Sequence, residues 1–84
     1  MQVTFKLFAN LQDYLPSEAK RTNALQLDVA DGTTVQDLIA RFSLPEKSCH
    51  LVLVDGTFVP AGARAARALR DGETLAIWPP VAGG

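Results

Sequence analysis

The stretch LRDGETLAIWPPVAGG, residues 69–84, decides the fold because it contains the last predicted strand and leads directly into the C-terminus. Its Asp-Gly pair predicts a turn over residues 70–73. Leu75 and Ile77 alternate with their neighbours, which predicts a strand with one face in the core. The proline pair follows this strand at once, so the strand and the C-terminal tail form one continuous element.

The C-terminal tail has a composition suited to entering a narrow site on another protein. Its two prolines fix the backbone angle φ near about −65° and favour an extended path. Its two glycines carry no side chain that would obstruct such a site. At roughly 3.3 Å per residue, the tail would reach about 20 Å from the domain. The tail residues are Pro79, Pro80, Val81, Ala82, Gly83 and Gly84.

The carboxylate of Gly84 is the group that such a tail would present. A carboxylate is a poor electrophile, so a partner must activate it; ATP-dependent adenylation followed by capture with sulfur or an amine fits this need. The proline pair would lower the entropy that is lost when a partner orders the tail. The alternative is that the Gly-Gly end arose by chance or through cloning.

The composition is that of one globular domain, because 48% of the 84 residues are hydrophobic and 20% are charged. We expect this domain to span residues 1–78 and the tail to span residues 79–84. A net charge of −1 argues against nucleic acid as the main partner. Residues 1–8 are too polar for a signal peptide, and no run approaches the roughly 20 apolar residues of a membrane span. We therefore expect a cytoplasmic protein without a membrane partner.

Cys49 is the single cysteine, so the chain can form neither an internal disulfide nor a cysteine metal cluster. We expect it to be a small buried apolar residue, and the adjacent His50 adds at most one further ligand. The sequence contains no evident nucleophile–base pair, metal constellation or phosphate-binding glycine loop. We therefore expect no bound metal or cofactor, and no enzymatic activity of the chain on its own.

Two further strands are predicted in the N-terminal part. Residues 3–7 and 25–29 each alternate between apolar and polar positions, and two such successive strands most often pair antiparallel. Phe8 breaks the alternation, so either a bulge turns it inward or the outer face of the sheet is partly apolar there. Between the strands we expect a helical turn that Pro16 ends, and then an exposed loop over residues 17–22.

One amphipathic helix and one hairpin follow. Either threonine of Thr33-Thr34 could begin the helix, with Gln36 or Asp37 as the partner three residues later. The apolar run LVLV at residues 51–54 precedes Asp55-Gly56, a strong signal for a hairpin. Only one helix is available to cover the sheet, so the outer side of this run must meet a loop or a partner.

Arg64, Arg67 and Arg70 recur at every third position, which is typical of a short helical turn with a basic stripe. We expect this stripe to be a solvated face. Recognition of an acidic partner or a phosphate is the alternative.

These elements predict a two-layer α+β domain. The long connection from the second strand through the helix to the third suits a crossover that places the first and last strands side by side. We therefore expect the β-grasp, or ubiquitin-like, fold: a mixed sheet of four to five strands packed on one main helix, with an extended C-terminal Gly-Gly tail.

Residues 69–84 resemble the C-terminal signature of bacterial sulfur carriers of the MoaD/ThiS type. That signature runs Leu, Asp-Gly-Asp/Glu, an apolar strand, a linker and Gly-Gly. The Pro-Pro-Val-x-Gly-Gly form is most similar to the small subunit of molybdopterin synthase. Val52–Gly56 resembles the strand and turn that precede the signature in this family, and Thr34–Leu38 resembles its helix start.

The resemblance implies a specific chemistry. An E1-like adenylating enzyme, of the MoaB, MoeB or ThiF type, would use ATP to activate Gly84, which follows Gly83 in the tail. A sulfur donor would convert the acyl-adenylate into a thiocarboxylate. The large subunit of molybdopterin synthase would then receive the tail, and the sulfur would pass to a pterin precursor to build the dithiolene of molybdopterin.

Other functions fit the same pattern. The tail could serve thiamine or cysteine biosynthesis, or the chain could be a ubiquitin-like modifier joined to lysines. A plain β-grasp interaction module with an incidental tail is a further alternative. We also expect Phe8 and Trp78 to share the outer sheet face with one side of residues 51–54, as an apolar partner-binding patch. Alternatively, Trp78 only closes the edge of the sheet.

Overall fold

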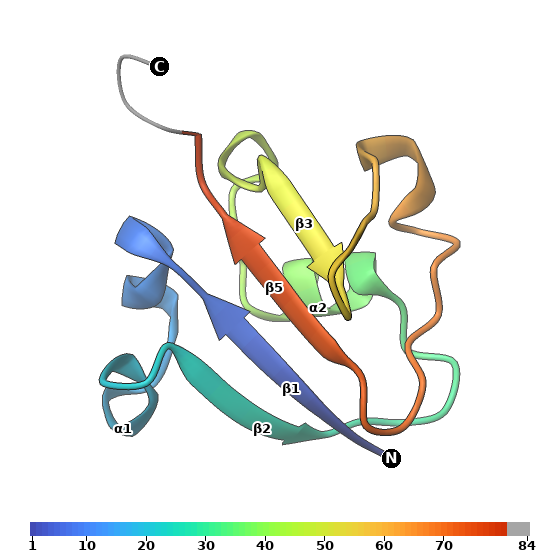
Figure 1. The fold of residues 1–84 in the computed structure, drawn as a ribbon, viewed down its shortest axis with the longest axis horizontal. Helices are drawn as coiled ribbons and strands as arrows, with labels where there is room; N and C mark the ends of the chain where they lie inside the picture. Colours follow the sequence, from blue (N-terminus) through green and yellow to red (C-terminus); the bar gives the residue numbers. More distant parts are fainter. Residues whose placement is uncertain (81–84) are drawn as a thin grey trace.

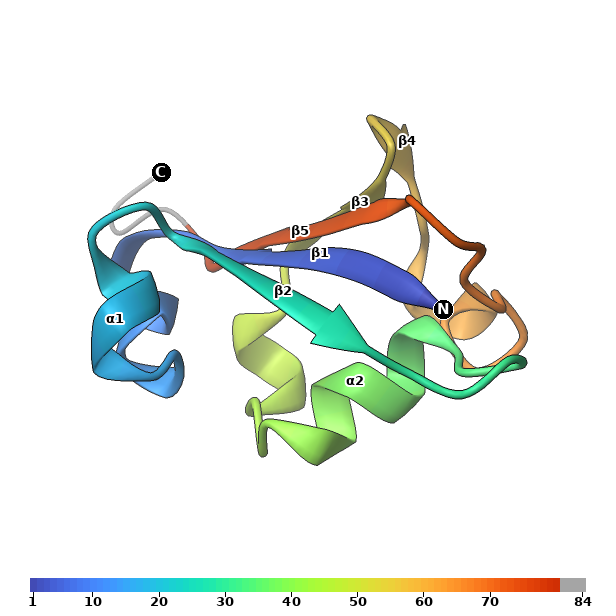
Figure 2. The ribbon, with the colours of Figure 1, turned by 90° about the horizontal axis from the view of Figure 1, so that it is seen from below.

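The computed structural model describes residues 1–80 as a five-stranded sheet with its helices on one face (Figure 1, Figure 2). The order of strands across the sheet is β2-β1-β5-β3-β4. The strands are β1 (Gln2–Leu7), β2 (Ala24–Asp28), β3 (Leu51–Val54), β4 (Thr57–Phe58) and β5 (Thr74–Trp78). The helices are α1 (Ser17–Lys20), α2 (Val35–Arg41) and the three-ten helices η1 (Ala9–Tyr14), η2 (Glu46–Ser48) and η3 (Ala61–Ala63).

The first and last strands lie side by side at the centre of the sheet, as the sequence predicts. β1 and β5 pair in parallel, with Phe5 opposite Leu75, and the remaining pairs of strands are antiparallel. The sheet is therefore mixed, and α2 crosses beneath it (Figure 2). This is the expected β-grasp arrangement, and it places the C-terminal end of β5 between β1 and β3.

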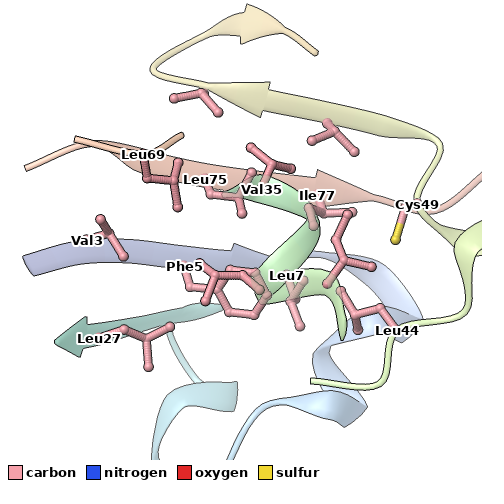
Figure 3. Close-up of a cluster of buried hydrophobic side chains, with 14 of the residues drawn as sticks. Val3, Phe5, Leu7, Leu27, Val35, Leu44, Cys49, Leu69, Leu75 and Ile77 are labelled. Atoms are coloured by element: carbon pink, nitrogen blue, oxygen red, sulfur yellow. The ribbon is translucent and has the colours of Figure 1, made fainter. Parts of the chain in front are cut away.

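The core lies between the sheet and α2, and it follows the predicted alternation. Alternate residues of β1 and β5 point to the helix side, where they pack with residues of α2 and of the neighbouring loops (Figure 3). Burial of these apolar side chains is the main stabilising contribution to the domain. The ten largest side chains that are almost completely buried are Phe5, Leu7, Leu11, Leu38, Leu75, Ile77, Val3, Val35, Val52 and Val54.

The start of α2 resolves the choice between the two threonines. The Asp37 backbone N–H donates to Thr34 Oγ1 at 3.1 Å, and the Thr34 N–H donates to Asp37 Oδ2 at 2.9 Å, which is a complete capping box. Thr33 instead donates from its hydroxyl to the Ala30 carbonyl at 2.7 Å. The hairpin is also as predicted, because Asp55 and Gly56 both have positive φ, 48° and 83°.

The predicted exposed loop at residues 17–22 is wrong in its first part. Ser17–Lys20 forms the short helix α1, and Ala19 on this helix is buried in the core. A single alanine gives no periodic signal, and the residues around it are mostly polar or charged. The sequence therefore did not predict the helical turn that burial of Ala19 stabilises.

The prediction that the three arginines form a solvated stripe is wrong at Arg64, whereas Arg70 is exposed as expected. Arg64 is only 4% exposed, and its Nε donates to the Val59 carbonyl at 3.4 Å. The carbonyls of Arg64 and Arg67 accept the N–H groups of Gln36 and Val35 at 3.1 and 3.0 Å. This segment therefore satisfies two of the free N–H groups at the start of α2.

The described part of the chain, residues 1–80, contains no helix that is both long enough and apolar enough to cross a membrane.

Candidate functional site: the origin of the C-terminal tail

The end of β5 is fixed on both sides where the tail begins. The Ile77 carbonyl accepts the Phe8 N–H at 3.2 Å, and the Trp78 carbonyl accepts the His50 N–H at 3.1 Å. Pro79 is half-buried and Pro80 is exposed, so the chain leaves the domain at a defined position. The predicted tail residues Val81, Ala82, Gly83 and Gly84 lie outside the described residues.

Phe8 and Trp78 form an aromatic stack on the outer face of the sheet, the face away from α2. Their ring centroids are 4.3 Å apart and the ring planes differ by 5°. Phe8 follows Leu7, which points into the core, and Trp78 follows Ile77, which does the same. The outer face is thus apolar at this point, which is one of the two explanations for the break in alternation at Phe8.

The apolar area continues from this stack across β3 to β4. Leu51 pairs with Trp78 in the ladder between β3 and β5, and it is 38% exposed. Leu53 pairs with Ala76 on one side and with Phe58 on the other, and Phe58 is 53% exposed. Directly paired residues point to the same face of a sheet. We call this set the outer apolar surface: Phe8, Leu51, Leu53, Phe58, Ala76 and Trp78.

Sequence reasoning predicted part of this surface and missed Phe58. Phe8, Trp78 and one side of residues 51–54 do share a face, as expected. The two-residue turn Asp55-Gly56 sets the register that places Phe58 opposite Leu53, so that signal was available in the sequence.

The sequence model of the ThiS family matches residues 5–84, which is nearly the whole chain, including both C-terminal glycines. The chain belongs to the ThiS family. No curated protein sequence gives a significant match.

Solved structures of similar fold include proteins of three kinds. SAMP1, the small archaeal modifier protein 1 of Haloferax volcanii, is 26% identical with a TM-score of 0.67. The thiamine biosynthesis protein ThiS of Geobacter metallireducens is 17% identical with a TM-score of 0.66. A chain from the complex of subunits 1 and 2 of the molybdopterin-converting factor of Helicobacter pylori is 16% identical with a TM-score of 0.61. Each comparison covers 100% of both chains.

These comparisons place the protein among the small β-grasp sulfur carriers of the ThiS and MoaD type, a group whose structural relatives include ubiquitin-like modifiers. Such carriers act as components of larger systems. The structural features of this ThiS-family member that concern chemistry are therefore the position of its tail and the surfaces around it.

The opposite end of β5 is held by an ion pair in the turn before the strand. Arg67 Nη2 lies 2.7 Å from Glu73 Oε2, and the Arg70 N–H donates to Glu73 Oε1 at 2.7 Å. The Arg67 guanidinium, together with the Arg70 N–H, lowers the pKa of the Glu73 carboxyl below its ordinary value, against the opposing effect of burial. Two of the three arginines in the segment thus stabilise the entry into β5.

Cys49 is a buried core residue in this ThiS-family protein, as the sequence predicts. It is 4% exposed, and its Sγ lies 3.5 Å from the Pro45 carbonyl oxygen, to which it donates. Burial raises the pKa of the Cys49 thiol; the positive charge of Arg64 opposes this effect and the negative charge of Glu46 adds to it. A thiol with a raised pKa is a poor nucleophile.

Within residues 1–80, no three His, Cys, Asp or Glu side chains come together in a way that could hold a metal ion.

Proposed function

We propose that this protein carries sulfur as a thiocarboxylate on Gly84 and that it is the small subunit of molybdopterin synthase. The observation that supports this most is the continuity of the chain from the central strand into the tail. β5 leads without a loop into Pro79-Pro80, and the ThiS family match continues through Gly84. An end that served no purpose would have no reason to follow the family pattern to its last residue.

The proposed chemistry takes place in two activation steps. First, an oxygen of the Gly84 carboxylate attacks the α-phosphorus of ATP on an E1-like adenylating enzyme, and pyrophosphate leaves. Second, a hydrosulfide anion supplied by a sulfur donor attacks the carbonyl carbon of the acyl-adenylate, and AMP leaves as the thiocarboxylate forms. The first step converts an unreactive acid into a good acyl donor, and the second uses this activation to place a nucleophilic sulfur on the carrier.

In the final step the thiocarboxylate sulfur forms a bond to a carbon atom of a pterin precursor on the large subunit. Water then cleaves the resulting thioester, which leaves the sulfur on the pterin and restores the Gly84 carboxylate. A sulfur anion is a stronger nucleophile than the carboxylate oxygen it replaces. The carrier contributes the sulfur and its delivery, while the partner binds the pterin and supplies the acid–base groups. The buried, protonated Cys49 is not suited to act as a second sulfur carrier.

The outer apolar surface is the proposed contact area for these partners. It begins at the Phe8–Trp78 stack, next to the first residues of the tail, and extends to Phe58. Large aromatic side chains at the centre of an interface typically contribute most of the binding energy. The complex of subunits 1 and 2 in the Helicobacter pylori molybdopterin-converting factor supports a large-subunit partner.

The proline pair before Val81 favours molybdopterin synthesis over thiamine synthesis as the destination of the sulfur. The test is to delete the gene in its own cell and to measure molybdoenzyme activity and the requirement for thiamine. The proposal predicts loss of molybdoenzyme activity and growth without thiamine. The gene lacking codons 83 and 84 should fail to restore activity, and a Lys20→Ala variant, altered at an exposed position on α1, should restore it. A thiamine requirement with normal molybdoenzyme activity would contradict the assignment.

A role as a protein modifier is the second candidate, because SAMP1 is 26% identical over the full length of both chains. A modifier would be joined through Gly84 to lysine side chains of other proteins. The last Lys or Arg of the sequence is Arg70, so trypsin would leave residues 71–84 on each modified lysine. Finding this branched remnant on many proteins would favour the modifier, whereas its absence, together with thiocarboxylate on the free chain, would favour the carrier.

A further inference from the structure

A small cleft lies on the helix side of the sheet, opposite the outer apolar surface. It has a volume of about 290 Å³ and lies between η1 and η2. Figure 2 shows both segments below the sheet, in blue and in yellow-green. Ligand pockets for whole small molecules usually measure roughly 300–1,000 Å³, so this cleft suits a single side chain better than a cofactor. It is lined by Asn10, Leu11, Asp13, Tyr14 and Ser48.

Both walls of the cleft are connected to the end of β5, where the tail begins. Phe8 donates its N–H to the Ile77 carbonyl and accepts the Leu11 N–H at 3.1 Å, so η1 starts from the tail origin. The other wall is formed by Ser48. His50, two residues after Ser48, donates its N–H to the Trp78 carbonyl. In Figure 1 these two segments flank the end of β5. A protein that takes up the tail would therefore come close to this cleft.

The three-ten geometry of η1 groups the side chains that line the cleft. In such a helix, residues three positions apart lie above one another on the same face. Asn10 is therefore next to Asp13, and the buried Leu11 is next to Tyr14, which is 39% exposed. Gln12 is used differently, because its Oε1 accepts from Asn23 Nδ2 at 3.4 Å. Two adjacent rows of side chains on η1 thus place an amide and a carboxylate beside an aromatic ring.

The charge of the cleft favours a cation. Asp13 is the only charged residue in the lining, and it is exposed. In the part of the chain that the structure describes, the ion pairs join Met1 to Asp28 and Arg67 to Glu73, so Asp13 has no cationic partner there. Asn10, Ser48 and Tyr14 add oxygen atoms that can accept hydrogen bonds.

Of the two common cationic side chains, arginine fits this lining better than lysine. A guanidinium group is planar and can stack on an aromatic ring such as that of Tyr14. Its five N–H donors can contact the Asp13 carboxylate and neighbouring oxygens at the same time. A lysine ammonium is more strongly hydrated and gains less from an open cleft of this kind.

We propose that this cleft binds the guanidinium group of an arginine on the protein that receives the C-terminal tail. The nature of that protein rests on the proposed function, whereas the preference of the cleft for a guanidinium group does not. The partner would then hold the tail origin from two sides, with apolar contacts on the outer face and one charged contact on the helix side.

The test is a titration of the isotopically labelled full-length protein, followed by amide chemical shifts in NMR spectra. The probe is N-acetyl-arginine N-methylamide, and the control is the citrulline compound, which has the same shape but no charge. We expect saturable shifts at Asn10, Asp13, Tyr14 and Ser48 with the arginine probe only. Equal shifts with both compounds, shifts centred elsewhere, or no shifts at these residues would overturn the proposal.

Two variants make the titration specific. Asp13→Asn should weaken binding of the arginine probe about two- to fivefold, the range expected for an exposed ion pair. Asp31→Asn removes another exposed carboxylate, in the turn before α2, and should leave binding unchanged. Equal affinity in the wild-type and Asp13→Asn proteins would contradict the role of the carboxylate. The titration needs no sulfur on Gly84, so a negative result would not argue against the proposed sulfur transfer. Likewise, absence of sulfur on Gly84 would not argue against arginine binding in the cleft.

Discussion

Leu51 lies directly opposite Trp78 in the ladder between β3 and β5, and both side chains are on the face of the sheet away from the core. Trp78 is therefore placed between Leu51 on one side and the stacked ring of Phe8 on the other. This arrangement stabilises the last strand at the residue before the tail. It also leaves an apolar surface on which Leu51 and Phe58 are exposed, a feature typical of interaction sites.

Replacing Trp78 by alanine should weaken the binding of a partner more than it destabilises the domain. Trp78 is half-buried, so we expect its loss to lower the free energy of unfolding by about 1–2 kcal/mol. Binding to the adenylating enzyme or to the large subunit should weaken by about tenfold or more. Urea unfolding and calorimetric titration measure the two effects. Trp78→Phe keeps an aromatic ring and serves as the control. If the alanine variant folds and binds its partner as well as the wild type does, the role of Trp78 is only to close the edge of the sheet.

Phe58→Ala tests the far end of the outer apolar surface. Phe58 is 53% exposed on the short strand β4, so the free energy of unfolding should change by no more than about 0.5 kcal/mol. Partner binding should nevertheless weaken by about 1–2 kcal/mol, measured in the same titration. Thr57→Ala, at the preceding exposed position, is the matched control. If both variants bind equally well, the contact area ends near Leu51.

The ion pair between Arg67 and Glu73 predicts a specific loss of stability in acid. Because the folded-state pKa of Glu73 is lowered, its contribution is complete above the ordinary glutamate pKa of about 4.3 and disappears as the pH falls through the lower folded value. Urea unfolding from about pH 7 to about pH 2 should show this decline. Glu73→Gln should be less stable than the wild type at neutral pH and should converge with it in acid. A Glu73→Gln curve that stays parallel to the wild-type curve over this pH range would argue against the pair.

Cys49 should react slowly with thiol reagents in the folded protein. It is buried and its pKa is raised, so both access and the thiolate fraction are low. Reaction with a chromogenic disulfide at neutral pH should be much faster in denaturant than in buffer. Cys49→Ala should still accept sulfur on Gly84. Rapid reaction of the native protein would contradict the burial of Cys49. Loss of sulfur loading in the Cys49→Ala variant would indicate that this thiol takes part in the chemistry.

The sequence predicted the elements whose patterns are local. The alternation in β1 and β5, the cap at Thr34 and the turn at Asp55-Gly56 each follow from the conformational preferences of a few neighbouring residues. The crossover rule then placed β1 beside β5. The candidate site at the end of β5 was predicted by the same reasoning, from the proline pair and the two glycines that follow the strand.

The features that the sequence did not predict depend on contacts between distant segments. Arg64 is buried because its segment accepts the first N–H groups of α2, and no local pattern of arginines contains that information. Ala19 is buried for a similar reason, through contact of α1 with the sheet. The cleft beside Asp13 needs both η1 and η2, which are far apart in the sequence. Such arrangements become visible only when the tertiary structure is known.

The measurement that tests the central claim most directly is the intact mass of the protein isolated from its own cell, with fragmentation of its C-terminal peptide. The account predicts a population in which one sulfur replaces one oxygen, with the change confined to Gly84. This population should disappear when the adenylating enzyme is deleted. An unmodified Gly84 in a cell that is actively making its sulfur-containing cofactors would contradict the account.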